Sequence, residues 1–141
     1  MKKVIALILA LVMALALVAC GDKTDAKDDT TPPTDGANTI YVMGPTPDHG
    51  WTAQAGAYAE AKCKEITDAG TYKAVYLPAS SGEEQVDQVN TIIANGDAVG
   101  VVMMALDDSA QAGQEALYAE KIPFISFDRI IEATEKYAIL N

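Results

Sequence analysis

Short apolar runs punctuate the chain after its N-terminal third. They occur at 40–43, 74–77, 99–104 and 123–127. Each has Gly, Pro or Asp within two residues of one end, a pattern typical of β-strands. A further apolar run at 137–140 predicts a fifth strand.

The segments between these runs carry small and apolar residues every three or four positions, which predicts helices. The first helix stops at Gly70, and Cys63 on its apolar side is expected to be a buried small residue. The residues sharing that side are Gly56, Ala59, Cys63 and Ile66.

Two further helices carry start signals. Ser81 and Glu84 form a capping box at the start of the second helix, and Gly96 ends it. Asp108 with Gln111 is predicted to cap the third, which extends through Lys121. The inward positions are Val86, Val89 and Ile93 in the second helix, and Gly113, Ala116 and Leu117 in the third.

The strand starts lie roughly 25–34 residues apart with one helix between each pair, which predicts a doubly wound α/β fold. Such a fold has one parallel sheet with helices on both faces. The run at 99–104 holds no polar residue and predicts a central strand buried on both faces. Small helix residues such as Gly56 and Gly113 would let the helices lie close to the sheet.

The N-terminus predicts export. Lys2 and Lys3 precede an uncharged apolar run at 4–19, and Cys20 follows directly, which resembles a bacterial lipoprotein signal. In such proteins the cysteine carries diacylglycerol after cleavage. The alternative is an uncleaved membrane anchor, but the run is shorter than the ~20 residues that a spanning helix needs.

The segment that follows predicts a tether. Residues 20–38 are rich in Asp, Thr and Pro and lack aromatic side chains, which is typical of a flexible linker. The domain organisation is therefore a signal peptide at 1–19, a lipidated linker at 20–38 and a folded domain at 39–141. Because Cys20 is assigned to lipid, Cys63 has no partner for a disulfide.

Charge narrows the choice of partners. The chain carries 10 basic and 20 acidic residues; without Lys2 and Lys3 the balance is 8 − 20 = −12. This acidic balance argues against nucleic-acid binding and against electrostatic adhesion to anionic lipid.

In an open parallel sheet, ligands bind beyond the carboxyl ends of the strands. The loop after the first strand holds Asp48 together with His49 and Trp51, the only His and the only Trp of the chain. A flat aromatic ring there can stack on a sugar, although it could instead shield a sheet edge. Asp48 could contact ligand or cap the following helix.

Polar residues also follow the later strands: Asp107 after the third, Asp128 and Arg129 after the fourth, and Asn141 after the fifth. Arg129 is the only arginine. Its planar donor group beside the Asp128 carboxylate suits a polyol, whose hydroxyls both donate and accept hydrogen bonds. The alternative is a structural ion pair.

The segments PTPDHGWTAQAG, VNTIIANGDAVGVVMMALDDSA and KIPFISFDR, placed after a lipoprotein signal and tether, resemble the type I periplasmic-binding-protein-like family. Within it the likeness is to ribose- and galactose-type sugar-binding proteins of ABC importers. The resemblance implies that Asp128 and Arg129 hydrogen-bond sugar hydroxyls. Ribose-type members place an Asn where this chain has Ala105, so that sugar contact is either missing or supplied by Asp107.

Members of this family have two lobes that close on the ligand, and 39–141 corresponds to a truncated N-terminal lobe. The resemblance implies a lipid-anchored protein outside the cytoplasm, at the cell membrane, that delivers a monosaccharide to an ABC permease. The alternative is a sensory receptor that presents a sugar or furanosyl signal to a transmembrane kinase.

An enzyme is not expected. One His and one cysteine outside the lipid site make neither a zinc site nor a thiol site with recognisable spacing. The chain also lacks G-x-G-x-x-G, Walker and G-x-S-x-G motifs, so no cofactor is predicted.

Overall fold

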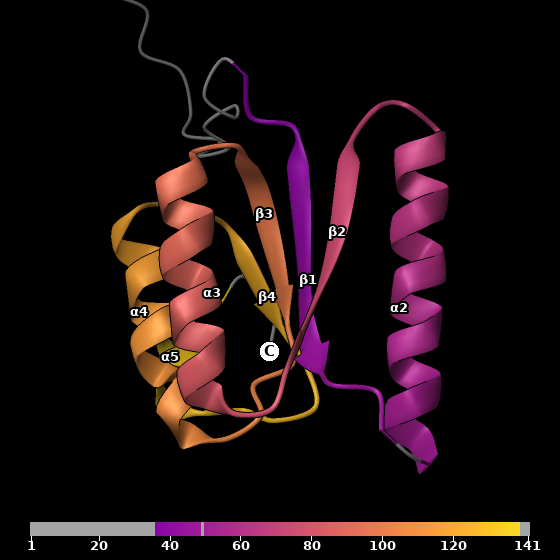
Figure 1. Ribbon diagram of the computed structural model, residues 1–141. Helices are drawn as coiled ribbons and strands as arrows, with labels where there is room; N and C mark the ends of the chain where they lie inside the picture. Colours follow the sequence, from indigo (N-terminus) through magenta and orange to yellow (C-terminus); the bar gives the residue numbers. More distant parts are fainter. Residues whose placement is uncertain (1–35, 49, 139–141) are drawn as a thin grey trace, which may run out of the picture. The chain divides into compact units, whose positions relative to one another are not determined.

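In residues 36–48 and 50–138, which the computed structural model describes, four strands form one parallel sheet (Figure 1). The strands are β1 (Thr39–Pro45), β2 (Lys73–Ala79), β3 (Ala98–Met103) and β4 (Phe124–Ser126). Their order is β2-β1-β3-β4. The chain therefore passes from β1 outward to β2 and returns across β1 to β3, so the direction of winding reverses between β1 and β3.

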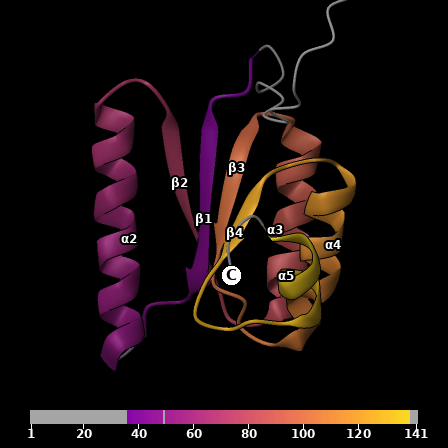
Figure 2. The same ribbon diagram turned by 180° about the vertical axis from the view of Figure 1, so that it is seen from behind.

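Helices lie on both faces of this sheet. They are α2 (Gly50–Asp68), α3 (Gly82–Asn95), α4 (Gln111–Ala119) and α5 (Glu132–Tyr137). The first, α2, lies on one side, whereas α3, α4 and α5 group on the other (Figures 1 and 2). The doubly wound α/β fold predicted from the sequence is confirmed. None of the described helices combines the length and apolar character needed to cross a membrane.

The core lies on the α3 and α4 face. In register across the sheet, Tyr41 pairs with Val101 and Val101 with Phe124, and all three side chains are buried. They pack against Val89 and Leu117 from the two helices. Burying apolar side chains of this kind contributes about 1.5–3 kcal/mol each and is the main force holding the helices on this face.

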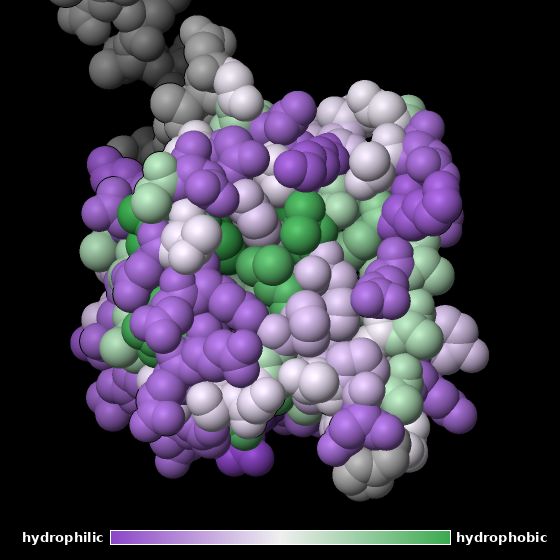
Figure 3. All heavy atoms as spheres, viewed as in Figure 1, coloured by the Kyte–Doolittle hydropathy of each residue, from purple (hydrophilic) through white to green (hydrophobic). Residues whose placement is uncertain are grey.

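The opposite face is covered less completely. Val42, Val102 and Ile125 form one row across the sheet, and each is only half-buried. The neighbouring Tyr76 of β2 lies under α2, where its hydroxyl would be 3.3 Å from a Cβ at Gly56. In Figure 3 the strongly hydrophobic residues over the strands lie nearer α3, and residues of intermediate hydropathy lie toward α2. The segment 99–104 forms a central strand as predicted, with β1 and β4 as neighbours, but Val102 is only half-buried, so the prediction that it is buried on both faces is wrong in the described structure.

The strand positions follow the sequence pattern closely. The four strands start within a residue or so of the predicted positions, and β2 continues through Pro78, where the pattern had placed its end. Proline is tolerated there because β2 is an edge strand of the sheet formed by the described residues, where it pairs with β1 and needs no N–H on its other side. Cys63 is buried as predicted. Burial raises the pKa of its thiol, and the negative charge of Glu60 raises it further.

Three further predictions need correction. Tyr137 does not begin a strand but ends α5, because its ring stacks on Tyr118 of α4 with 4.2 Å between centroids; residues 139–141 lie outside the described residues. The third helix ends at Ala119 rather than Lys121, whose φ of 58° is left-handed. Gly113 faces Val86 and Val89 of α3 rather than the sheet.

The caps place the helix starts. Ser81 Oγ accepts a hydrogen bond from Glu84 N at 3.2 Å, as predicted, whereas the Glu84 carboxylate accepts from Ser80 N rather than Ser81 N. Gly96 ends α3 in a left-handed conformation. Asp108 does not cap the third helix: a 3-10 turn (Asp108–Ala110) precedes α4, Asp107 caps that turn by accepting from Ser109 N, and α4 itself starts after Ala110 without a side-chain cap.

Candidate functional site

The candidate site is the carboxyl edge of the sheet, which we define as residues 46–48, 80–81, 104–107 and 127–131. These segments follow the four parallel strands, so they lie along one edge of the sheet (Figure 1). The loops after β1 and β3 flank the point where the winding reverses. Ligands in doubly wound sheets bind beside such a point.

Asp107 ties two of these loops together. Its carboxylate accepts hydrogen bonds from Gly82 N at 3.0 Å, from Ser109 N at 2.8 Å and from the Ser109 hydroxyl. The bond from the Ser109 side chain lowers the pKa of Asp107 most. The two backbone bonds and the charge of Arg129 lower it further, whereas partial desolvation raises it. The group is therefore a carboxylate at neutral pH, held between the start of α3 and the loop after β3.

Gly82 makes this contact possible. A Cβ at this position would lie 2.5 Å from Ala110 N and 2.6 Å from Asp107 Oδ1, distances that no side chain can occupy. Only glycine lets the start of α3 approach the loop so closely.

Gln85 of α3 also holds the loop after β3. Its side chain is fully buried, donates to Met104 O at 2.8 Å and accepts from Leu106 N at 3.0 Å. One amide thus pairs with the backbone on both sides of Ala105. Sequence reasoning missed Gln85; the available signal was its place one helical turn before Val89, on the buried side of the predicted helix.

Asp128 and Arg129 form a tight turn after β4. Arg129 N donates to Phe127 O at 2.9 Å, and Asp128 between them has φ of 68°. A γ-turn with positive φ at its central residue is rare and strained, and for a residue other than glycine this conformation costs of order 1 kcal/mol. Backbone strain of this kind clusters at functional sites.

The two side chains of this turn are exposed and do not pair with each other. The ion pairs found among the described residues are Lys62–Glu65 and Lys64–Asp68, both on α2 and away from the carboxyl edge. The structural ion pair considered as an alternative for Asp128 and Arg129 is therefore absent from the described structure. Both side chains are exposed to solvent, and Arg129 interacts electrostatically with Asp107.

The other predicted residues lie at the β1 end of the edge or outside the described structure. Trp51, in the first turn of α2, is 57% exposed, and Asp48 Oδ1 accepts a hydrogen bond from Thr52 Oγ1 at 3.1 Å. That bond links Asp48 to the first turn of α2, in keeping with a helix-start role. His49 and Asn141 lie outside the described residues.

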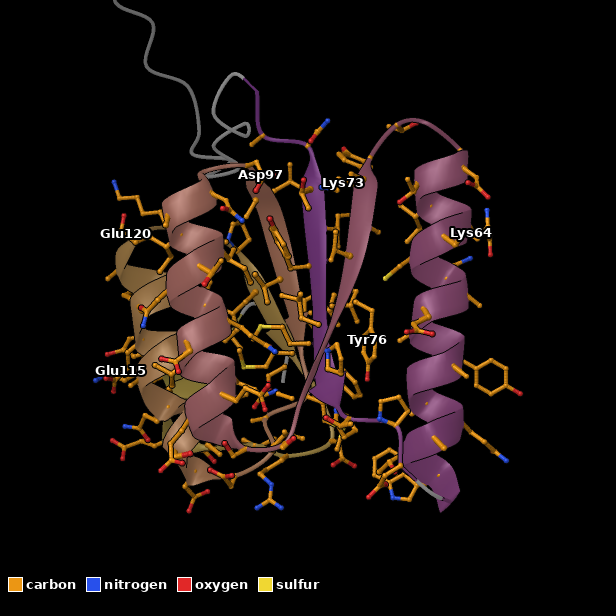
Figure 4. All side chains as sticks on the ribbon, in the orientation of Figure 1. Lys64, Lys73, Tyr76, Asp97, Glu115 and Glu120 are labelled. Atoms are coloured by element: carbon orange, nitrogen blue, oxygen red, sulfur yellow. The ribbon has the colours of Figure 1, made fainter. Side chains whose placement is uncertain are left out.

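A separate polar cluster lies at the opposite, amino edge of the sheet, where Figure 4 labels Asp97 and Lys73. The Asp97 carboxylate accepts from Thr39 Oγ1 at 2.7 Å and from Tyr41 OH at 2.8 Å. This cluster joins the start of β1 to the end of α3. Within residues 36–48 and 50–138, no group of three or more His, Cys, Asp or Glu side chains is placed to hold a metal ion.

Comparison with known proteins places this architecture. A family model described as periplasmic binding protein domain matches residues 40–141. A solved structure described as an ABC transporter, LacI family transcriptional regulator from Brachyspira murdochii superposes with a TM-score of 0.59 and 13% sequence identity over 75% of this chain. The chain spans 33% of the length of that structure. No curated protein sequence matches the chain. Since the family model covers more than half of the sequence, the chain belongs to the periplasmic binding protein domain family.

Proposed function

We propose that this chain is the N-terminal lobe of a solute-binding protein that captures a monosaccharide outside the cytoplasm for an ABC permease. Membership of a binding-protein family supports the binding role, and the description of the structural neighbour as an ABC transporter supports the transport role. The chain would bind its ligand without breaking a bond, so the function needs no catalytic group and no cofactor.

The observation that carries the proposal is the exposed Asp128–Arg129 turn at the carboxyl edge. Sugar hydroxyls donate and accept hydrogen bonds, so they need both kinds of partner. Arg129 supplies a planar set of donors, and the carboxylates of Asp128 and Asp107 supply acceptors. Asp107 already accepts three hydrogen bonds from Gly82 and Ser109, and its remaining acceptor capacity would face the ligand beside Arg129.

Trp51 would complete the site by stacking on the apolar face of the sugar ring. Its indole is 57% exposed at the start of α2, so most of the ring is free to contact a ligand. Asp48 and His49 directly precede α2 in the sequence, and Asn141 ends the given sequence; we assign them to the ligand site as flanking contacts.

Calorimetry against D-ribose, D-galactose and D-glucose tests this proposal in the two-lobed protein that we infer. Arg129→Lys keeps the charge and loses the planar donor pair. It should weaken binding of the tightest-bound sugar by about 1.5–3 kcal/mol, roughly 10- to 150-fold. Trp51→Ala should weaken it by about 1 kcal/mol. Tyr58→Ala is the matched control, because Tyr58 is an exposed aromatic residue on α2 two turns further from the edge. Binding of both variants within twofold of the wild type would contradict the assignment.

The lipid anchor is a proposal on the sequence alone, since residues 1–35 lie outside the described structure. A lipidated Cys20 would hold the protein at the outer face of the cell membrane, near a permease. Cys20→Ser should abolish incorporation of labelled fatty acid and release the protein from the membrane fraction. Labelling that persists in this variant would rule out the anchor.

A further inference from the structure

A chain of buried polar side chains runs beneath the Asp128–Arg129 turn. Gln114 on α4 is fully buried, and its amide oxygen accepts a hydrogen bond from Thr134 Oγ1 at 2.6 Å. Its amide nitrogen donates to Ser126 Oγ at 3.4 Å and lies 3.5 Å from Met103 Sδ. Thr134 is also fully buried, and Ser126 is 2% exposed.

The two partners of Gln114 flank the turn in sequence. Ser126 is the last residue of β4, and Thr134 lies in α5, so the segment between them carries Asp128 and Arg129. One buried amide therefore fastens both ends of this exposed segment to α4. Within the described segment, the turn is also held by backbone bonds from Phe127 N to Met103 O and from Arg129 N to Phe127 O.

Stability alone does not explain an amide at this position. The neighbouring core residues Leu117 and Met103 are apolar, and apolar side chains at all three positions, 114, 126 and 134, would avoid desolvating an amide and two hydroxyls. Polar side chains in a core give little net stability, but they define which groups face one another. At Gln114 the groups so defined are the end of β4 and the start of α5.

We infer that Gln114, with Thr134 and Ser126, positions the Asp128–Arg129 turn for ligand binding. This inference rests on the proposed function, in which that turn contacts the sugar. Gln114 does not touch the ligand itself; it acts through the segment whose ends it holds. Displacing a contact group by about 1 Å can cost as much as 100-fold in a site that depends on geometry.

A pair of matched variants tests the inference in the same two-lobed protein, carrying Cys20→Ser. Thr134→Val keeps the size of the side chain and removes the bond to Gln114. Thr39→Val removes a bond of the same kind, to Asp97, from an equally buried threonine at the opposite edge of the sheet. Thr134→Ser restores the hydroxyl. Hydrogen–deuterium exchange followed by mass spectrometry at low protein concentration reads the peptide that spans 124–131, and titration with D-ribose and D-galactose reads affinity.

We expect Thr134→Val to speed exchange in the 124–131 peptide by about tenfold relative to the peptide that spans α2, an element that contains neither substitution, and Thr134→Ser to leave that ratio near wild type. Thr39→Val should not raise the ratio, although it should lower overall stability. Sugar affinity should fall about fivefold in Thr134→Val alone. Equal ratios in Thr134→Val and Thr39→Val would overturn the inference, as would unchanged affinity in a Thr134→Val protein whose turn has loosened. If no variant binds either sugar but the ratio still rises in Thr134→Val alone, the positioning of the turn stands and the assignment of these sugars fails.

Discussion

At the scale of single residues, two positions at the carboxyl edge, Asp128 and Gly82, have backbone or packing requirements that restrict which side chain can stand there. Asp128 takes a left-handed backbone conformation that glycine adopts without strain, yet it carries a carboxylate that is exposed to solvent. Gly82, in contrast, is glycine because no side chain fits between the start of α3 and Asp107. We therefore attribute the first residue to the proposed ligand role and the second to packing.

Asp128→Gly separates these two explanations. Removing the side chain should raise the free energy of unfolding by about 0.5–1 kcal/mol. The relief of backbone strain at positive φ outweighs the greater conformational entropy that glycine gives the unfolded chain. Sugar binding should weaken by about 1.5–3 kcal/mol, because a charged acceptor is lost. Chemical denaturation and calorimetry measure the two effects.

Lys121→Gly is the control for this substitution. Lys121 has φ of 58° and lies just after α4, away from the carboxyl edge. It should gain similar stability and bind sugar as the wild type does. A loss of stability in Asp128→Gly would show that its carboxylate serves the fold.

At the scale of elements, the sequence pattern predicted the order and starts of the strands because their apolar runs are short and well bounded. It failed where tertiary contacts decide. Tyr137 belongs to an apolar run that favours a strand, but stacking on Tyr118 keeps it in α5. Asp107 and Asp108 are adjacent, and only the approach of Gly82, distant in sequence, identifies Asp107 as the cap.

The candidate site was only partly visible in the sequence, and its ligand role stays a prediction. The single arginine beside an aspartate after a strand identified the Asp128–Arg129 turn. Gln85 and Gln114 were missed because glutamine is ordinary on an amphipathic helix, and only its position among buried residues marks it as unusual. Gln85, Val89 and Ile92 share one buried side of α3 at helical spacing, so a polar residue in that series was the available signal.

The cluster that joins β1 to α3 at the amino edge predicts a dependence of stability on pH. The hydrogen bond from Thr39 lowers the pKa of Asp97; desolvation opposes it, and the bond from Tyr41 and the charge of Lys73 add to the lowering. A carboxylate with a lowered pKa in the folded state contributes stability above its unfolded pKa of about 3.9, and this contribution is lost as the pH falls through the folded value.

We therefore expect Asp97→Asn to be less stable than the wild type at neutral pH and to lose less stability between about pH 5 and pH 2. Urea denaturation at several pH values measures this. The pKa of Asp107 is also lowered, so Asp107 contributes stability that is lost in the same pH range. The slope of unfolding free energy against pH should therefore become smaller in Asp97→Asn without disappearing. Asp87→Asn, at an exposed position of α3, controls for the loss of one negative charge. Parallel curves for Asp97→Asn and the wild type would contradict the link.

At the scale of the whole molecule, the sheet is protected unequally. The α3 and α4 face is closed, with Phe124 only 2% exposed, whereas Val102 and Ile125 on the other face are half-buried and lie beyond the reach of α2. Phe127 and Ile130 next to β4 are about half exposed, at 47% and 52%. In the described residues β4 also pairs on one side only, so an apolar face and an open edge meet there.

Residues 38–141 by themselves should therefore be marginally stable and prone to aggregate, as shown by irreversible thermal unfolding and by large species in sedimentation. Ile125→Lys should reduce aggregation and cost less than about 1 kcal/mol, because the lysine stem can lie along the sheet with its ammonium in water. Phe124→Lys, one residue earlier on the closed face, should prevent folding, because it would bury an unpaired charge. Sharp, reversible, two-state unfolding of the unmodified domain, or severe destabilisation by Ile125→Lys, would mean that the α2 face is closed in solution.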